Sequence, residues 1–492
     1  MRFHVLGIGS IGTLVAHNLR RAVPSAEVNL LQRRAKNLRG KGKETDKERN
    51  LTLEVQRHGT KTVSSGYVVD LTKADWPGKE HFKTELEEQG IAVSAGGPID
   101  SLIVCTKAQG TSHAIGEIAD RIQPSSVITL LQNGMGVYDE LCAKYWPDPG
   151  LRPQFILGTT THGVTPGERN GSILHMTKPG DGALKLGVVP DPRGKTSYDR
   201  WLWGSAASRI PSVGQPIAPT YPLPKLNAEP NVRETLNAFL SMTELNPEVL
   251  PMANLYHELL LKVAVNATIN ALTASLGGGF MRNGDLVRSS PGFQLIKQTA
   301  AETSAVLQAY LRNLAGGHPP EPEVMRLFSA TSLEDRIKSI ATQTQDNTSS
   351  MAMDVKAGRD TEIDYINGFF VALGTKLGVP TPLNRMLVQM VKLRAEMAGL
   401  GNTFLPPIVD VIKRRERKMV NKQEEKLARR ALSLEERRLS LERIEQRESE
   451  LEKRERRRAR KSAKRQRVRE QEAARKLATV EMPPVVMSSK EQ

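Results

Sequence analysis

The stretch FHVLGIGSIGTLVAHNLRRA, residues 3–22, determines the predicted fold. Residues 3–9 are a short apolar run that leads into glycines, which is typical of a buried strand followed by a tight turn. Residues 11–22 carry apolar side chains at the helical period, and residues 27–31 form a second apolar run. Strand, glycine turn, helix and strand make a β-α-β unit, so we predict a parallel sheet covered by helices.

The remaining patterns divide the chain into segments. Apolar runs at 101–106 and 127–131 predict further strands, and the polar stretch 33–49 predicts a loop insertion. Residues 190–232 contain eight prolines, and we expect no helix or strand at that density. Helical periodicity extends from residue 252 to 398, with a break at residues 277–279. We therefore predict an α/β protein with a Rossmann-type domain (1–189), a proline-rich insertion or linker (190–250), an all-helical domain (251–405) and a basic, partly disordered helical tail (406–492).

The net charge of the 492 residues is +16, and most of it lies near the C-terminal end. Residues 413–477 hold 26 basic and 13 acidic side chains, or +13, so the rest is nearly neutral. Leu427, Leu434 and Leu441 recur every seven residues, but Arg430 and Arg437 occupy the other seam positions, so the coiled-coil signal is weak. The pattern fits a long solvated helix held by i,i+4 Glu–Lys/Arg pairs, and it also fits a helix that binds a partner or weakly self-associates.

Several classes of protein are disfavoured by composition. The only cysteines are Cys105 and Cys142, so the chain is no disulfide scaffold, and no histidines and cysteines cluster at metal-ligand spacing. No uninterrupted apolar run reaches the roughly 18 residues of a bilayer span, so we predict none. Because a strand pattern begins by residue 3, we expect no cleavable presequence and a cytoplasmic location, with the mitochondrion as the alternative.

A G-x-G-x-x-G motif, Gly7-Ile8-Gly9-Ser10-Ile11-Gly12, lies between the first strand and the first helix. In this context Gly7 allows the turn, Gly9 lets a pyrophosphate approach the backbone, and Gly12 permits close helix–strand packing. The motif predicts dinucleotide binding by Gly7, Gly9, Ser10, Ile11 and Gly12. The alternative is a glycine turn kept only for packing.

The end of the second strand distinguishes NADP from NAD. NAD-binding proteins usually place Asp or Glu there to hold the ribose hydroxyls, but this chain has Leu31-Gln32-Arg33-Arg34. Guanidinium groups match phosphate geometry, so Arg33 and Arg34 favour the 2′-phosphate of NADPH. Alternatively, they are simply the first cations of a solvated basic loop.

A candidate catalytic lysine lies in the apolar stretch HELLLKVAVNATINALTA, residues 257–274. Lys262, Asn266 and Asn270 are spaced by four residues, so they share one face of a helix. Burying a lysine on an apolar helix is costly unless it has a partner or a catalytic role. The same spacing equally fits a lysine that reaches the surface beside asparagine neighbours.

Six blocks in order carry a family resemblance: VLGIGSIGTL at 5–14, Thr106-Lys107-Ala108, LQNGMG at 131–136, GTTTHG at 158–163, the helix 262–274, and NTSSM at 347–351 leading to TEIDYING at 361–368. Over roughly residues 1–400 the chain resembles the ketopantoate reductase (2-dehydropantoate 2-reductase) family, as a long, fungal-type member. The resemblance implies a Rossmann domain, a helical domain like the C-terminal domain of 6-phosphogluconate dehydrogenase, and reduction of ketopantoate to pantoate with NADPH in pantothenate and coenzyme A synthesis.

The resemblance also implies a role for each matching residue. Lys262 matches the general acid that protonates the C2 oxygen, and Glu362 matches the acidic residue that binds the substrate hydroxyl and helps to place the lysine. Substrate-binding positions match Asn266, Asn270 and Ser350. Asn133, Lys107 and Arg33 match residues near the cofactor. His162 is expected to be a strand-end or cleft-lining residue, because the family assigns acid–base work to the lysine.

Two functions remain open at this stage. The first is an NADPH-dependent reductase acting on a small 2-oxo acid, with a homodimer as the expected assembly. The second is a reductase-like fungal mitochondrial translation activator, or an RNA- or ribosome-binding protein, that uses its basic tail. Because a pure adaptor need not keep Lys262, Asn266, Ser350 and Glu362 together, the sequence favours the enzyme.

Overall fold

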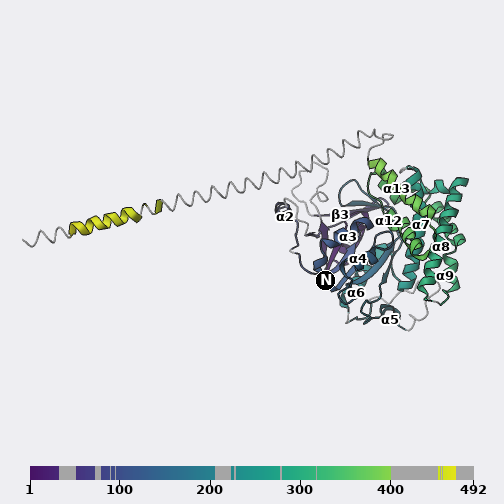
Figure 1. Cartoon of the computed structure of the whole chain (residues 1–492), viewed down its shortest axis with the longest axis horizontal. Helices are drawn as coiled ribbons and strands as arrows, with labels where there is room; N and C mark the ends of the chain where they lie inside the picture. The colour runs from purple at the N-terminus through teal and green to yellow at the C-terminus, as the bar shows by residue number, and fades with distance from the viewer. Residues whose placement is uncertain are drawn as a thin grey trace, which may run out of the picture. The chain divides into compact units, whose positions relative to one another are not determined.

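The computed structural model describes residues 1–32, 51–72, 79–88, 90–94, 96–204, 223–226, 229–277, 280–316, 318–399, 453–454, 456 and 458–472. They belong to two compact units, Met1–Asn402 and Thr403–Gln492. The first unit contains a sheet region followed by a helical region (Figure 1). The second unit is described separately below.

An eight-stranded sheet of order β12-β11-β8-β7-β6-β1-β2-β5 forms the centre of the N-terminal region. Six neighbouring strands are parallel: β5 (Val68–Leu71), β2 (Glu27–Gln32), β1 (Arg2–Leu6), β6 (Ile99–Val104), β7 (Ile122–Leu130) and β8 (Gln154–Thr160). β11 (Leu184–Val188) pairs antiparallel with β8, and β12 (Pro247–Val249) pairs parallel with β11. The prediction of a Rossmann-type parallel sheet is confirmed.

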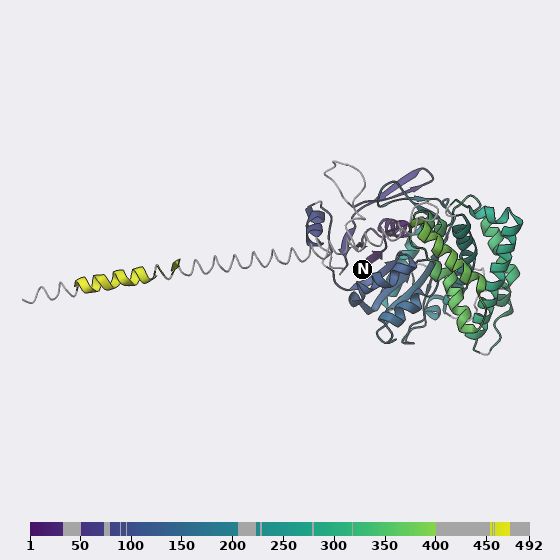
Figure 2. The same ribbon diagram turned by 45° about the horizontal axis from the view of Figure 1, so that its top comes forward.

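Helices cover both faces of this sheet (Figure 2). On one face, α1 (Ser10–Ala22) and α6 (Pro230–Ser241) contribute Leu14 and Phe239 to a core shared with the strands. On the other face, α3 (Ala108–Gly116) and α4 (Val137–Tyr145) contribute Ile115 and Leu141. A further helix, α2, spans Lys79–Glu88. This double covering keeps the strand interiors dry and leaves their carboxyl ends accessible to a ligand.

The interval 190–250 corrects one prediction. Instead of an insertion or linker, it holds α5 (Tyr198–Trp203), α6 and the sheet strand β12, although residues 205–222 and 227–228 lie outside the described part. Pro230 is the first residue of α6, where its missing N–H costs no helical hydrogen bond. Val232 and Leu236 are buried against the sheet. The number of prolines was therefore a poor guide, because a proline at the first position of a helix does not prevent the helix from forming.

A second, four-stranded sheet of order β4-β3-β10-β9 packs on α1. Its strands are β3 (Leu53–Arg57), β4 (Thr60–Ser64), β9 (Val164–Pro166) and β10 (Ser172–His175). His17 of α1 contacts the hydroxyls of Ser64 at 2.7 Å and Thr62 at 2.9 Å. Burial lowers the pKa of His17 to about 4, so a neutral imidazole holds this junction near neutral pH. The predicted loop 33–49 lies in the undescribed interval before β3.

The helical region is built around α7 (Met252–Gly277), which ends where the glycine run begins. It is surrounded by α8 (Ser290–Leu314), α10 (Ala330–Gln343), α11 (Ser350–Lys356), α12 (Ile363–Leu377) and α13 (Pro382–Gly399), and the short α9 spans Pro322–Leu327. Within the described ranges, α7 alone is long and apolar enough to span a membrane, but 72% of its most apolar window is buried by these neighbours. Its apolar character is therefore explained by its position in a protein core.

In the second unit the described residues 453–454, 456 and 458–472 are helical, and all of them are exposed. The leucines at 427, 434 and 441, on which the coiled-coil prediction depends, lie outside the described residues.

Candidate active site

The predicted cofactor turn forms at the carboxyl end of β1. Gly7 has φ +94°, and a Cβ there would lie 2.5 Å from the backbone nitrogen of Thr106. A Cβ on Gly12 would lie 2.1 Å from the Gly7 carbonyl oxygen, so only glycine allows α1 to start so close to the turn. Both glycines are required by the packing that the motif predicts.

The residues of this turn fit a dinucleotide. Gly9 is the N-cap of α1, no side chain caps it, and the first turn of the helix has no acidic residue. A Cβ on Gly9 would meet nothing within 4 Å, which leaves open space over the helix N-terminus. Unpaired helix N–H groups beside open space are suited to a phosphate anion. Ser10 and Ile11 form the first turn of α1, and β2 ends at Gln32, immediately before Arg33 and Arg34, which lie outside the described residues.

Lys262 projects from α7 to the carboxyl end of β8. Its Nζ donates hydrogen bonds to Thr159 Oγ1 at 2.9 Å and to the Thr160 carbonyl oxygen at 3.0 Å. An ammonium group has three N–H bonds, so these two contacts leave one donor for a third partner. The lysine therefore points toward the sheet edge instead of reaching the surface of the helical region.

Glu362 comes from the N-cap position of α12 and is buried. Its Oε1 accepts from the backbone nitrogen of Ala108 at 3.1 Å, and its Oε2 accepts from Asn133 Nδ2 at 3.3 Å. The carboxylate thus joins the helical region to the turns that follow β6 and β7. Because the amide nitrogen of Asn133 faces Glu362, its amide oxygen points elsewhere.

The lysine and the carboxylate influence each other electrostatically. Burial lowers the pKa of Lys262 to about 8, and the negative charge of Glu362 partly offsets this effect. Burial also raises the pKa of Glu362, against its contacts with Ala108 and Asn133. A lysine with a pKa near 8 exchanges a proton more readily at neutral pH than an exposed lysine. The negative charge of Glu362 thus acts on Lys262, the two side chains that the sequence analysis proposes as catalytic.

Lys107 is at the predicted strand end, but its ammonium is engaged with the helical region. Its Nζ pairs with Asp354 Oδ1 of α11 at 2.5 Å and donates to the Asp360 carbonyl oxygen at 3.3 Å. Gln109 Nε2 donates to the same carbonyl at 3.1 Å. These contacts hold the turn after β6 against the segment that leads to Glu362.

The predicted substrate residues lie along α7 and at the start of α11. Asn266 is half-buried and Asn270 is buried, one and two turns beyond Lys262. Ser349, and not Ser350, caps α11: its Oγ accepts from Ala352 N and contacts Thr273 Oγ1 of α7 at 2.7 Å. Ser350 is exposed as the first residue of the helix. The contact of this cap places the start of α11 against α7 at Thr273, three residues beyond Asn270.

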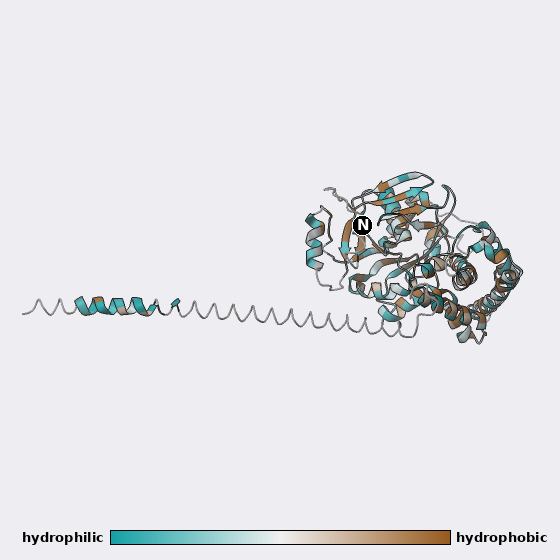
Figure 3. Cartoon of the chain, turned by 90° about the horizontal axis from the view of Figure 1, so that it is seen from above, coloured by the Kyte–Doolittle hydropathy of each residue, from teal (hydrophilic) through white to brown (hydrophobic). Residues whose placement is uncertain are grey.

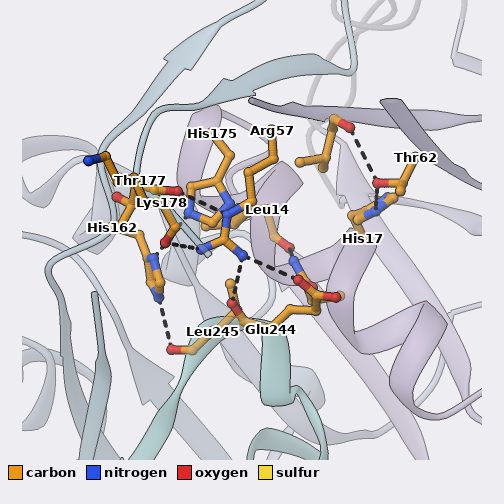
Figure 4. Close-up of polar contacts among 12 residues, drawn as sticks. Leu14, His17, Arg57, Thr62, His162, His175, Thr177, Lys178, Glu244 and Leu245 are labelled. Atoms are coloured by element: carbon orange, nitrogen blue, oxygen red, sulfur yellow. Dashed lines mark hydrogen bonds and ion pairs between the residues drawn. The ribbon is translucent and has the colours of Figure 1, made fainter. Parts of the chain in front are cut away.

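The imidazole of His162 contacts Leu245 and His175 (Figure 4). Its Nε2 contacts the Leu245 carbonyl oxygen at 2.8 Å, and its Nδ1 lies 3.1 Å from His175 Nε2. Both imidazoles are buried, which lowers their pKa values, that of His175 to about 4. Arg57 beside them donates to the Thr177 and Lys178 carbonyl oxygens. His162 follows β8 as predicted, and its contact with His175 of β10 joins the main sheet to the small one.

Several contributing residues have no predicted role. Thr159 and Thr160 hold the lysine, Asp354 holds Lys107, and Tyr365 ties α12 to α4 through Glu140 Oε2 at 2.7 Å. The two threonines belong to the GTTTHG block, but the sequence does not show that they bind Lys262. The described residues include no group of three or more His, Cys, Asp or Glu side chains placed to hold a metal ion.

Gly134 offers a test of how the site is assembled. It has φ +89°, and a Cβ there would lie 2.7 Å from Tyr365 Cβ and 2.8 Å from the Tyr365 carbonyl oxygen. We expect Gly134→Ala to push the turn that carries Asn133 away from α12 and to lower kcat at least tenfold, since small displacements of reacting groups are costly. Gly136→Ala is the matched control, because its φ is also positive, at +93°, but its Cβ would meet nothing within 4 Å. Equal kcat values in steady-state assays of the two variants would contradict this account.

Comparisons with known proteins agree with this arrangement. The family models for ketopantoate reductase PanE/ApbA and for its C-terminal part match residues 3–191 and 254–395. A probable 2-dehydropantoate 2-reductase of Schizosaccharomyces pombe is 25% identical over 80% of this chain and 95% of that protein. The 2-dehydropantoate 2-reductase of Shigella flexneri is 30% identical over 62% of this chain and 78% of that protein. The 2-dehydropantoate 2-reductase of Saccharomyces cerevisiae is 27% identical over 76% of this chain and 89% of that protein.

Solved structures show the same fold. A D-mandelate dehydrogenase bound to NADH and anilino(oxo)acetate aligns over 81% of this chain and 99% of its own, with a TM-score of 0.53 and 18% identity. A 2-dehydropantoate 2-reductase from Geobacter metallireducens aligns over 80% of this chain and 99% of its own, also with a TM-score of 0.53 and 18% identity.

The fold and the relatives define a two-domain oxidoreductase with a Rossmann-type nucleotide-binding domain. The two family models together match most of the first compact unit. The Shigella relative is 30% identical to this chain over 78% of its own length. The chain belongs to the ketopantoate reductase family.

Proposed function

We propose that the chain reduces 2-dehydropantoate to pantoate with NADPH. The observation that carries the proposal is the placement of Lys262, a half-buried lysine with two of its N–H bonds fixed by Thr159 and Thr160 at the carboxyl end of the sheet. Ligands of open α/β sheets bind at this edge, so a 2-oxo acid there would meet the third N–H of the ammonium.

In this mechanism the bound NADPH supplies the hydride that reaches C2 of the substrate. Lys262 donates its proton to the C2 oxygen, where negative charge develops. Glu362 keeps the ammonium charged in its buried surroundings and fixes the amide of Asn133. Asn266, Asn270 and Ser350 form the polar side of the substrate pocket, since they extend from Lys262 along α7 to the start of α11.

An NADPH-oxidation assay of the purified full chain with a panel of 2-oxo acids tests the substrate. We expect ketopantoate to give the highest kcat/KM, and pantoate to form in equal amount to the NADPH consumed. A tenfold preference for another 2-oxo acid, or no oxidation with any of them, would reject the proposed reaction.

The cofactor preference is tested separately by Arg33→Ala combined with Arg34→Ala. A charge-assisted hydrogen bond to phosphate contributes about 1.5–3 kcal/mol, so we expect the preference for NADPH over NADH to fall by about tenfold to a hundredfold, mainly through a higher KM for NADPH. Arg21→Ala, in the last turn of α1, is the control. An unchanged ratio of kcat/KM values for the two cofactors would place the 2′-phosphate elsewhere.

The alternative function, an adaptor of the mitochondrial translation-activator type, needs none of these side chains. Two observations support the enzyme: the charge of Glu362 acts on Lys262, and Glu362 accepts a hydrogen bond from Asn133. The homodimer and the cytoplasmic location stay predictions.

A further inference from the structure

The helical residues 456 and 458–469 of the second unit have an unusual distribution of charge. It contains no acidic residue, and eight of its described residues are cationic: Arg456, Arg458, Arg460, Lys461, Lys464, Arg465, Arg467 and Arg469. All eight are exposed, and Figure 3 colours most of the segment as hydrophilic. These described residues, 456 and 458–469, are called the cationic segment. None of its residues has a role in the reductase mechanism.

The helical period arranges these cations on one broad face. At about 100° per residue, the eight positions cover an arc of roughly 220°. The remaining arc carries only small or polar side chains, namely Ala459, Ser462, Ala463 and Gln466. Val468, the largest apolar residue of the segment, lies within the cationic arc, between Lys464 and Lys461. The segment therefore has a cationic face but no apolar face.

This pattern selects among possible partners. A helix that lies on a membrane or in a protein groove needs large apolar anchors at helical spacing, which this segment lacks. A partner held by charge alone must instead present dense and regular negative charge. At about 1.5 Å per residue, positions 456 and 469 lie about 20 Å apart along the helix, and duplex nucleic acid carries about one phosphate per 1.7 Å, or about 12 phosphates over that length. The match in charge density favours nucleic acid.

We propose that the cationic segment binds the phosphodiester backbone of nucleic acid. Contacts to phosphates from arginine and lysine position a protein without reading sequence, so the binding should depend strongly on salt and weakly on base sequence. Like charges at i,i+4, such as Arg456 with Arg460 and Lys461 with Arg465, destabilise the free helix. Phosphates that neutralise these pairs should therefore raise the helical content of the segment. This inference goes beyond the reductase function and does not depend on it.

Fluorescence anisotropy of the full chain with labelled RNA and DNA duplexes of one sequence tests the proposal. We expect a Kd of about 1–100 µM near physiological salt, and a plot of log K against log salt with a slope of about −5 to −7 if six to eight cations contact phosphates. A preference for RNA or for DNA identifies the source of the phosphates, and binding to both supports the shared chemistry.

Two matched variants locate the contact. Replacing Arg456, Arg460, Lys464 and Arg467 with Gln removes one edge of the cationic arc, and the slope should become shallower by about 3–4. The combination Ala459→Gln and Ala463→Gln changes the opposite arc and should leave the slope unchanged. An unchanged slope in the first variant, or tighter binding to phosphatidylglycerol vesicles or to polyglutamate than to either duplex, would overturn the proposal. NADPH oxidation, measured on the same samples, reports the reductase function independently.

Discussion

Replacement of Lys262 by alanine is expected to lower kcat for ketopantoate reduction by a factor of about 10²–10⁴, the range that a general acid usually contributes. The affinity for NADPH should change little, because Lys262 belongs to α7, whereas the glycine turn leads into α1 and Arg33 and Arg34 follow β2 in sequence. Steady-state kinetics and a fluorescence titration with NADPH measure the two quantities separately.

Lys262→Met accompanies the alanine variant, because it keeps most of the side-chain volume and so separates lost chemistry from a cavity beside α7. Lys392→Ala is the control for removal of a lysine, since Lys392 Nζ pairs with Asp364 Oδ1 at 2.7 Å on partly exposed side chains. Turnover in Lys262→Met within a few-fold of the parent would remove this lysine from the mechanism.

Glu362→Gln is expected to lower kcat by a factor of about 10–10³, because the Lys262 ammonium loses the carboxylate charge that stabilises it in a site of low polarity. An amide has one accepting oxygen, so it can keep the contact with Ala108 N or the contact with Asn133 Nδ2, but not both. The pKa of Lys262 should also fall below about 8, since the negative charge that holds it up is gone.

Asp364→Asn is the matched control for this prediction. Its carboxylate lies two residues away on α12, is more than half exposed and pairs with Lys392. We expect the same kcat and the same pH dependence as in the parent. If Glu362→Gln behaved like Asp364→Asn, the carboxylate would have no part in the reaction.

The Rossmann-type sheet could be predicted from the sequence because its strands are continuous apolar runs and its glycine turn has fixed steric demands. Gly7 and Gly12 meet backbone atoms at distances that no side chain tolerates. Such local constraints are visible in sequence. The role of α6 was missed because Pro230 occupies the first helical position, where proline is favoured.

The site itself was only partly predictable. The helical spacing of Lys262, Asn266 and Asn270 gave their common face, but not the direction in which the lysine points. That direction depends on Thr159 and Thr160, about a hundred residues earlier in the chain. Likewise, the pairing of Glu362 with Asn133 joins separate domains, and no local periodicity encodes it. The resemblance to a family predicted that Glu362 helps to place Lys262, but it did not predict the contacts with Thr159, Thr160 or Asn133.

The pH dependence of ketopantoate reduction tests the role of Lys262 most directly. A general acid must be protonated to act, so log(kcat/KM) should be level near neutral pH and fall by about one unit per pH unit above the pKa of Lys262, which is about 8. This alkaline limb should be absent from the residual activity of Lys262→Ala. A profile that stays level to pH 10, or an alkaline limb that persists in Lys262→Ala, would contradict the assignment of this lysine as the proton donor.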